Sequence, residues 1–382
     1  MIINKLELEN FRNYDHLTAS FIPEINVFYG FNGQGKTNLL EAIYLCTCGR
    51  SHRTSRDADL IKFEQLHYQV LIEFIPQDEY CETLSIAYKK DNFSSARGKR
   101  IIKHDGIELT RIVDLMGIFH AVIFAPEDLQ LLKDGPGIRR RFLDILISQI
   151  DKLYFIKLQQ FVKIIQQRNK MLKDKNTNSK WQSLMDIWDF QLAELVTYII
   201  SKRIQVLNEI SDMTKEFYQQ ISSGSEMIDL KYECTFKTNL KLEKEKVVQN
   251  IYDELQKQRQ NDLYRGSTSL GPHHDDMQFF LNNKQAKLVA SQGQTRSIVL
   301  ALKLAELECL TEKTGIRPVL LLDDVMSELD QNRRNALIGA MKSAQVFVTC
   351  TEPDQVEEFS FSKNTDKSSI KYFNIDNGKF IK

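Results

Sequence analysis

The chain has 382 residues, of which 42% are hydrophobic and 27% are charged. This length fits two domains of about 150 residues or one large domain with an insertion, and the composition excludes disordered and fibrous chains. Lys and Arg together number 51, as do Asp and Glu, so a uniformly basic surface is excluded while a local basic patch is not.

The sequence carries no sign of membrane insertion or secretion. No stretch approaches about 18 uninterrupted apolar residues, and the N-terminal segment alternates apolar and charged residues without the apolar core of a signal peptide. The six cysteines form no pair of CxxC units, which disfavours a zinc site and fits reduced thiols. We therefore expect a cytoplasmic protein.

The N-terminal part predicts mainly strands. Segments rich in β-branched and aromatic residues predict strands at 2–8, 25–29, 68–75, 83–88 and 120–125. Asp105-Gly106 is a two-residue hairpin signal between two short apolar runs. One helix is predicted at 37–45, directly after a glycine-rich turn.

A helical period replaces the strand pattern from residue 138. Apolar residues recur at helical spacing over 138–172, a polar loop follows at 173–180, and further helical runs cover 181–199 and 206–217. Helices of this length usually pack as a coiled-coil-like hairpin. A packed helical lobe and a projecting arm are the two alternatives.

The strand pattern returns in the last third of the chain. Strands are predicted at 228–236, 277–281, 319–322 and 346–350, with helices at 243–260 and 294–312. We therefore expect one α/β domain interrupted by a helical segment. Its N-terminal part is 1–137, the helical segment is 138–227, and the C-terminal part is 228–382.

One segment matches the phosphate-binding pattern GxxxxGK[ST] between a predicted strand and a predicted helix. Its residues are Gly30, Phe31, Asn32, Gly33, Gln34, Gly35, Lys36 and Thr37. The glycines let backbone N–H groups face a phosphate at the N-terminus of the helix. Lys36 would neutralise the β- and γ-phosphates, and Thr37 would offer its hydroxyl to Mg²⁺. The segment predicts a nucleotide site.

An acidic pair, Asp323-Asp324, ends the apolar strand predicted at 319–322. Four apolar residues in a row indicate a strand that is buried on both faces. Asp323 is positioned to hold Mg²⁺, and Asp324 stands where a general base or water-orienting carboxylate would act. The sequence contains no guanine-reading Asn-Lys-x-Asp motif. ATP and Mg²⁺ are therefore the expected cofactors.

Ser291-Gln292-Gly293-Gln294 opens the helix predicted at 294–312. The structural reading of this segment is a Ser N-cap with a glycine turn. Because it lies between a phosphate loop and an acidic strand, it is also similar to the signature motif of the ABC ATPase superfamily. Residues 327–330 are similar to the D-loop of that superfamily. This resemblance implies a site that Ser291 and Gly293 of a second subunit complete at the γ-phosphate.

Within that superfamily the whole chain resembles the RecF family of bacterial recombination mediators, which are SMC-like. The segments that carry the resemblance are the phosphate loop and residues 10–14, 49–54, 124–129, 139–144, 271–276 and 323–330. It implies a P-loop ABC-type ATPase head with an inserted helical arm, and Arg12 as a further nucleotide contact. The chain departs from the expected family pattern at His274, where Arg is usual. Thr351-Glu352-Pro353 stands where transporter ATPases have a switch histidine.

The same resemblance implies a role in DNA repair and replication. Such a protein would bind DNA at single-strand gaps, cooperate with RecO and RecR to load RecA, and support replication restart and the SOS response. ATP would drive homodimerisation, and slow hydrolysis would release the dimer. No covalent chemistry on DNA is expected.

Two basic clusters are candidates for DNA contact. Lys99, Arg100 and Lys103 lie in the segment 89–103, which has six basic residues and one acidic residue, and Arg139 and Arg140 belong to the second cluster. Such clusters grip phosphates without reading sequence, and a solvated surface is the alternative for each.

Three other interpretations are open to the sequence. His273-His274-Asp275-Asp276 has the composition of a metal cluster, but a turn with structural polar contacts is favoured. A transporter ATPase subunit is disfavoured by the long separation between Lys36 and Ser291. A structural SMC-like protein would need a coiled coil several times longer than the helical segment seen here.

Overall fold

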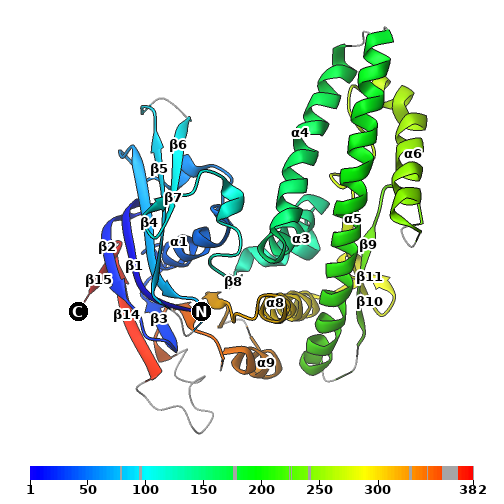
Figure 1. Ribbon diagram of the computed structural model, residues 1–382. Coiled ribbons are helices and arrows are strands. Elements are labelled where there is room, and N and C mark those ends of the chain that lie inside the picture. The colour runs from blue at the N-terminus through cyan, green and yellow to red at the C-terminus, as the bar shows by residue number, and fades with distance from the viewer. Residues whose placement is uncertain are drawn as a thin grey trace. The chain divides into compact units, whose positions relative to one another are not determined.

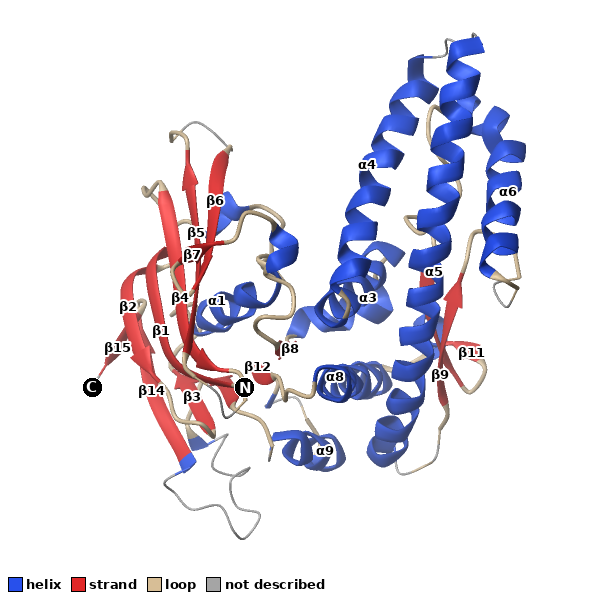
Figure 2. Ribbon diagram, viewed as in Figure 1, coloured by secondary structure: helices blue, strands red, loops and turns tan. Residues whose placement is uncertain are grey.

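A computed structural model describes residues 1–77, 80–93, 97–174, 179–222, 224, 226–239, 242–326, 329–341, 343–354 and 369–381, with the backbone alone for residues 179 and 180. The chain forms two compact units (Figures 1 and 2). Unit 1 comprises Met1–Gln130, Met213–Met227 and Ala290–Lys382, and unit 2 comprises Leu131–Asp212 and Ile228–Val289.

Unit 1 contains an antiparallel sheet with the strand order β2-β1-β4-β5-β6-β7. The strands are β1 (Ile2–Phe11), β2 (Tyr14–Ser20), β4 (His67–Ile75), β5 (Glu82–Lys90), β6 (Gly98–His104) and β7 (Ile107–Glu108). β4 alternates buried and half-buried residues along its length, as a strand with one face on the core does. Asp105 and Gly106 have φ angles of 49° and 79°, which confirms the predicted hairpin turn.

The second sheet of unit 1 is mostly parallel, with the order β15-β14-β3-β13-β12-β8. Its strands are β3 (Ile25–Tyr29), β8 (Ala121–Phe124), β12 (Val319–Asp323), β13 (Val346–Cys350), β14 (Ile370–Asp376) and β15 (Lys379–Ile381). Every residue of β12 and β13 is buried, which accounts for their unbroken apolar sequence. β3 lies between β13 and β14, so both neighbours of this N-terminal strand come from the far end of the chain.

The helix α1 (Lys36–Cys48) contacts strands of both sheets, and one hydrophobic core includes residues from all three layers. Because α1 has protein on opposite sides, its apolar residues are not confined to one stripe. Unit 1 also contains the helices α8 (Gln292–Thr314) and α9 (Gln331–Met341) and the 3₁₀ turns η1 (Asp57–Leu60), η2 (Ile112–Asp114) and η3 (Pro126–Leu129). α8 packs against β8 and η3. The short helix α2 (Gln130–Lys133) stands at the boundary of the two units.

Unit 2 is largely helical. Its helices are α3 (Pro136–Ile150), α4 (Lys152–Asp174), α6 (Lys244–Arg265), α7 (Ala286–Val289) and most of α5 (Ser179–Ser222). α4, α5 and α6 run alongside one another (Figure 1). A small antiparallel sheet with the order β11-β10-β9 completes the unit, from β9 (Ile228–Glu233), β10 (Asp276–Leu281) and β11 (Lys284–Gln285).

Buried ion pairs join the three long helices of unit 2. Arg168 of α4 is fully buried and bonds to Asp189 of α5 at 2.8 Å and Asp262 of α6 at 2.7 Å. Arg259 of α6 also bonds to Asp189, at 2.6 Å. Removing one partner from such a network leaves an uncompensated charge in the interior and is strongly destabilising. The pairs therefore fix the alignment of α4, α5 and α6.

The helical segment differs from its sequence prediction in two ways. The run predicted at 138–172 breaks at Asp151, whose Oδ1 accepts the N–H groups of Leu153 and Tyr154 and so begins α4. α5 continues without interruption for 44 residues through the gap predicted after residue 199. Part of the loop predicted at 173–180 lies outside the described residues.

The two units also divide the chain differently from the expected domains. The sequence pattern assigns residues 228–289 to the C-terminal part of the α/β domain, whereas they cluster with the helices in unit 2. The physical reason is the set of ion pairs just described, since Asp262 and Arg259 of α6 bond to α4 and α5.

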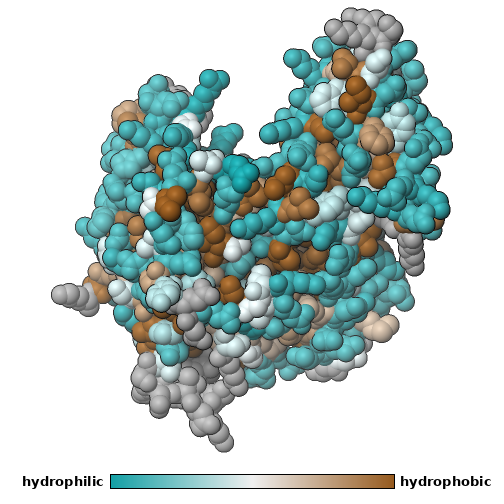
Figure 3. Space-filling model, viewed as in Figure 1, coloured by the Kyte–Doolittle hydropathy of each residue, from teal (hydrophilic) through white to brown (hydrophobic). Residues whose placement is uncertain are grey.

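On the face drawn in Figure 3 most side chains are hydrophilic, with apolar ones scattered among them. None of the helices in the described residues combines the length and the apolar character needed to cross a bilayer.

Candidate nucleotide-binding site

The phosphate-binding loop connects β3 to α1, as the sequence predicts. Gly30 and Gly35 have φ angles of 143° and 114°, which residues other than glycine rarely adopt. A Cβ on Gly30 would lie 2.3 Å from the carbonyl oxygen of Ile375, and one on Gly35 would lie 2.5 Å from Asn13. These two positions therefore require glycine for both conformation and space.

Neighbouring segments hold the loop from two sides. The Asn13 side chain donates to the Gln34 carbonyl at 2.8 Å, and the Tyr14 hydroxyl donates to the Gly35 carbonyl at 3.0 Å. From the turn between β14 and β15, the N–H of Gly378 donates to the same Gln34 carbonyl at 3.1 Å. These supports were not predicted from the sequence, although Asn377-Gly378 is a recognisable turn signal.

Lys36 is buried at the start of α1. Its Nζ donates to the carbonyl oxygens of Gly30 at 2.6 Å and Phe31 at 3.0 Å. Burial lowers the pKa of Lys36, and the carboxylate of Asp324 opposes that effect. Phe31, Asn32 and Gly33 at the tip of the loop are exposed. The site thus places a fixed cation under a solvent-facing turn.

A hydrogen bond connects the two predicted motifs. The Thr37 hydroxyl donates to Asp323 Oδ1 at 2.9 Å, although the two residues are 286 positions apart in the chain. Thr349 of β13 also donates to Asp323 Oδ1, at 2.8 Å, because Asp323 and Thr349 are paired in the parallel register. Burial raises the pKa of Asp323. A hydroxyl and a carboxylate side by side form an oxygen-donor set of the kind that Mg²⁺ takes.

Asp324 follows directly in a left-handed conformation, with φ of 52°. This conformation is uncommon for a residue other than glycine, although Asp and Asn tolerate it better than most. The backbone N–H of Asp324 donates to the Thr349 hydroxyl at 2.8 Å. Thr349 therefore contacts the carboxylate of Asp323 and the backbone of Asp324. Asp324 lines a small cavity with Asp128 and Arg296. Ser327 and Glu328 of the predicted D-loop lie outside the described residues.

Ser291 is the N-cap of α8. Its hydroxyl accepts the N–H of Gln294 at 3.2 Å, and the Gln294 side chain accepts the N–H of Ser291 at 2.7 Å. Gly293 is fixed by Arg333 of α9, which donates to the Gly293 carbonyl at 2.6 Å and to the Ser297 hydroxyl at 2.8 Å. The predicted Ser N-cap is confirmed, whereas Gly293 lies inside the first turn of α8 and does not form a separate glycine turn. Its contact with a nucleotide in a second subunit stays a prediction.

Arg12 lies in the turn after β1 and forms a bidentate ion pair with Glu41 of α1, with N–O distances of 2.8 and 2.7 Å. Glu41 is fully buried and also accepts from Ser51 at 2.5 Å. Burial by itself would raise the pKa of Glu41, but the hydrogen bonds from Arg12 and Ser51 lower it. The structure thus shows a structural partner for Arg12, and its predicted contact with the nucleotide remains a prediction.

The first basic cluster divides over the two faces of β6. Lys99 and Lys103 are exposed, whereas Arg100 points the other way and bonds to Asp57 at 2.5 to 2.6 Å. This division follows from the two-residue period of a strand. Lys89 of β5 is paired with Lys99 in the register, so it shares the exposed face. Lys99 has a weak ion pair with Glu108 at 3.8 Å.

The arginines of the second basic cluster form an ion pair and a hydrogen bond within unit 2. Arg139 is buried and bonds to both carboxylate oxygens of Asp276, at 2.7 and 2.8 Å. Arg140 is half-buried and donates to the carbonyl of Asp275 at 2.8 Å. A DNA contact from Arg139 would require breaking a buried ion pair, so we do not retain Arg139 as a DNA-binding residue. The DNA contact predicted for Arg140 stays a prediction.

The segment 273–276 forms a structural turn, as favoured from the sequence. Asp275 is buried and accepts from the hydroxyls of Tyr232 and Thr235, both at 2.7 Å. His273 and His274 both lie against the carbonyl of Thr268. Burial, followed by the neighbouring His274, lowers the pKa of His273 to about 4. The imidazole of His273 is therefore neutral at physiological pH.

The parallel sheet, the phosphate loop and the acidic strand together define an ATPase head of the SMC type. The family model for the RecF/RecN/SMC N-terminal domain matches residues 2–369. The DNA replication and repair protein RecF of Ruminiclostridium cellulolyticum is 43% identical over 93% of this chain and 94% of the relative. RecF of Clostridium perfringens is 38% identical over 99% of both chains. The chain belongs to the RecF family.

Solved structures agree with this assignment. The structure of RecF with ATP, described as the recombination mediator of the RecFOR pathway, has a TM-score of 0.89 at 35% identity over 100% of this chain and 97% of that chain. An Smc head domain from Pyrococcus furiosus, bound to the C-terminal domain of ScpA, has a TM-score of 0.53 at 18% identity, covering 100% of this chain and 96% of that chain. The second likeness concerns the fold alone.

Proposed function

We propose that this protein is an ATP-dependent DNA-binding protein of recombinational repair and replication restart. The observation that carries the proposal is the hydrogen bond between Thr37 and Asp323, at 2.9 Å. It joins the phosphate loop to the acidic strand, as a P-loop ATPase requires. The RecF relatives support the biological setting, since they are named as DNA replication and repair proteins.

The loop from Gly30 to Thr37 would cradle the phosphates of ATP through its backbone N–H groups. Lys36 would neutralise their charge from its buried position. Thr37 and Asp323 would hold Mg²⁺, which neutralises phosphate charge when bound. Asp324, fixed by Thr349 at the end of β12, would orient the attacking water and accept its proton.

ATP would act as a dimerisation switch. The N-terminus of α8, with Ser291 and Gly293, would close on the γ-phosphate held by a second copy of the chain. A helix N-terminus favours an anion, and both residues are held by hydrogen bonds that α8 and α9 supply. Slow hydrolysis would then separate the two copies.

DNA contact is proposed for the exposed face of β5 and β6. Lys89 and Lys99 stand directly opposite each other across the two strands, and like charges in that arrangement are destabilising. Lys103 extends the same face along β6. A phosphate backbone would relieve this repulsion and requires no base reading. Arg100 would serve this face only indirectly, through its bond to Asp57.

RecO and RecR are the proposed partners, with RecA as the recombinase that the complex loads at single-strand gaps during the SOS response. Support comes from the solved relatives, which are described as the recombination mediator of the RecFOR pathway. The identities favour a RecF protein over a structural SMC protein, because the RecF relatives are 43% and 38% identical to this chain and the Smc head domain is 18% identical.

The proposal is tested by measuring binding to gapped duplex and to intact duplex with ATP, ADP or no nucleotide. We expect ATP to strengthen binding, and a RecR column to retain the protein together with gapped DNA. The comparison variant is Asp323→Asn, which should retain the fold but should bind DNA equally with and without ATP. Equal DNA binding with and without ATP would contradict the proposal.

A further inference from the structure

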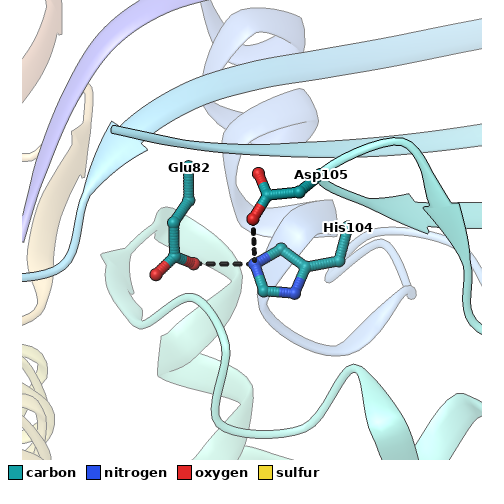
Figure 4. A group of neighbouring side chains, drawn as sticks. All are labelled: Glu82, His104 and Asp105. Atoms are coloured by element: carbon teal, nitrogen blue, oxygen red, sulfur yellow. Dashed lines mark hydrogen bonds and ion pairs between the residues drawn. The ribbon is translucent and has the colours of Figure 1, made fainter. Parts of the chain in front are cut away.

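Three potential metal ligands converge at one end of the antiparallel sheet in unit 1. Glu82 is the first residue of β5, His104 is the last residue of β6, and Asp105 begins the turn to β7. Their side chains point toward one another (Figure 4). One ligand atom from each lies within 4.8 Å of the others.

The distances leave the imidazole between the two carboxylates. His104 Nε2 lies 2.7 Å from Glu82 Oε2 and 3.7 Å from Asp105 Oδ2. The side chains of His104 and Glu82 are 28% and 25% exposed, and that of Asp105 is 52% exposed. The cluster is therefore open to ions from solvent while its members rest on an ordered sheet.

Asp105 is held in position by a neighbour of Glu82. Its Oδ1 accepts the backbone N–H of Thr83 at 2.8 Å and the Thr83 hydroxyl at 3.3 Å. These bonds fix the carboxylate and leave Oδ2 directed toward His104. Hydrogen bonds of this kind around a metal ligand orient it and strengthen metal binding.

The charges at this point favour a cation. Two carboxylates meet at one imidazole, which is their only basic partner among the described residues. The carboxylates outnumber the imidazole two to one, which favours a further positive charge at this point. His67, in contrast, faces the single carboxylate of Glu9 at 3.0 Å in the same sheet. The cluster of Glu82, His104 and Asp105 therefore holds one more carboxylate than the pair of His67 and Glu9.

We propose that Glu82, His104 and Asp105 bind a divalent transition-metal ion, with Zn²⁺ as the best fit. One imidazole nitrogen and two carboxylate oxygens form a donor set that suits Zn²⁺ and its first-row neighbours. The imidazole disfavours Mg²⁺ and Ca²⁺, which take oxygen ligands. Water would complete the coordination on the exposed side.

The bound ion would connect the start of β5, the end of β6 and the turn to β7. It would restrain the hairpin that carries Lys99 and Lys103 on β6. The site does not involve the phosphate loop, so it stands whether or not the proposed ATP switch is correct.

Cobalt(II) is the probe for this site, because its visible absorption reports coordination. The full chain is freed of metal with a chelator and titrated with Co²⁺ in excess Mg²⁺, which occupies sites made of oxygen alone. We expect one Co²⁺ per chain without the near-ultraviolet bands of thiolate ligands, and displacement by Zn²⁺.

The variants Glu82→Gln, His104→Gln and Asp105→Asn should each weaken Co²⁺ binding by about tenfold or more. Asn tolerates the left-handed conformation of residue 105, so the turn should remain intact. His67→Gln is the matched control and should bind Co²⁺ as the parent does. The proposal is overturned if the parent protein binds no Co²⁺ or if its Co²⁺ complex shows thiolate bands. It is also overturned if Co²⁺ binding survives all three changes or is lost equally in His67→Gln.

Discussion

Lys36 is a buried ammonium group whose bonds to the carbonyls of Gly30 and Phe31 stabilise the loop around it. Burial lowers its pKa, which shows that the site holds a charge in an unfavourable environment. Such an arrangement is characteristic of groups that act on a ligand.

Lys36→Ala should therefore reduce ATP affinity by at least about tenfold, since a hydrogen bond to a charged group contributes roughly 1.5–3 kcal/mol. Calorimetric titration with ATP measures the change. Lys5→Ala is the control, because Lys5 pairs with Glu7 and Glu73 on β1 and β4 and should leave affinity unchanged. Equal affinities for the two variants would show that Lys36 does not contact the nucleotide.

His273 provides a residue-scale prediction about pH. Its pKa in the folded chain is about 4, below the ordinary value of about 6.5. Above pH 6.5 the imidazole of His273 is unprotonated in both the folded and the unfolded chain. Between pH 6.5 and pH 4 it is protonated only in the unfolded chain. The free energy of unfolding should therefore fall as the pH falls through that window, by up to about 1.4 kcal/mol per pH unit.

His273→Gln should reduce this acid sensitivity. Denaturant unfolding at pH 7 and pH 5 gives the difference, and exposed His16 provides the control variant His16→Gln. An unchanged difference between the two pH values in His273→Gln would assign the acid sensitivity to other groups.

At the scale of elements, the basic face of the antiparallel sheet depends on strand alternation. Lys99 and Lys103 point to solvent, while Arg100 bonds to Asp57. A sequence reading groups all three because they are close together in the chain, and only the strand geometry separates them.

Reversing Lys99 and Lys103 to Glu should weaken DNA binding and flatten its salt dependence, by about 0.9 in the logarithmic slope for each DNA phosphate that the variant no longer neutralises. Fluorescence anisotropy over a salt series measures both effects. Glu108→Gln, which removes the acid beside Lys99, should act in the opposite direction. An unchanged slope would identify the cluster as a solvated surface.

The elements that the sequence predicts well are those whose local pattern and burial agree. β12 and β13 are apolar over most of their length and are buried on both faces. The turn at Asp105-Gly106 has the residues that its positive φ angles require. The loop and the Asp323-Asp324 pair are found because each has a fixed local motif.

Other features depend on tertiary interactions that no local pattern records. The break at Asp151 is a single cap inside a continuous helical period, and α5 continues because unit 2 packs along its length. Thr349 contacts both acids of the site only through the register between β12 and β13. Arg139 looks like a surface cation in the sequence, but its partner Asp276 lies 137 positions away.

At the scale of the whole molecule, the proposed switch needs two copies of the chain. Ser291→Arg should abolish ATP-dependent dimerisation while leaving ATP binding intact, because a bulky cation replaces a small hydroxyl at the N-terminus of α8. Sedimentation with ATP measures the dimer. Ser291→Asn is the control, since Asn also caps a helix and separates loss of the cap from loss of the interface. A dimer of normal strength in Ser291→Arg would place the nucleotide site within one chain.

Asp324→Asn should increase the amount of ATP-bound dimer, whereas Ser291→Arg should abolish it. Asn is nearly the same size and tolerates the left-handed conformation of this residue. Losing the base should slow hydrolysis by about 10²–10⁴-fold, so ATP-bound dimers should accumulate. Phosphate release and sedimentation on the same sample test this, and turnover at the parent rate would show that another group activates the water.

The position of β3 between β13 and β14 has a consequence for protein synthesis. The phosphate loop is synthesised well before the strands on both sides of it and the Gly378 N–H that holds Gln34, which follow only when the ribosome has reached residues 346–378. At about 5–20 residues per second, roughly 15–60 s separate the loop from its supports. A nascent chain would therefore lack a finished nucleotide pocket and, with ATP as the proposed dimerisation switch, would not dimerise with a neighbour on the same messenger RNA. A chain that stops before residue 370 should accordingly fail to retain ATP on a filter, even though all of its phosphate-binding motif is present.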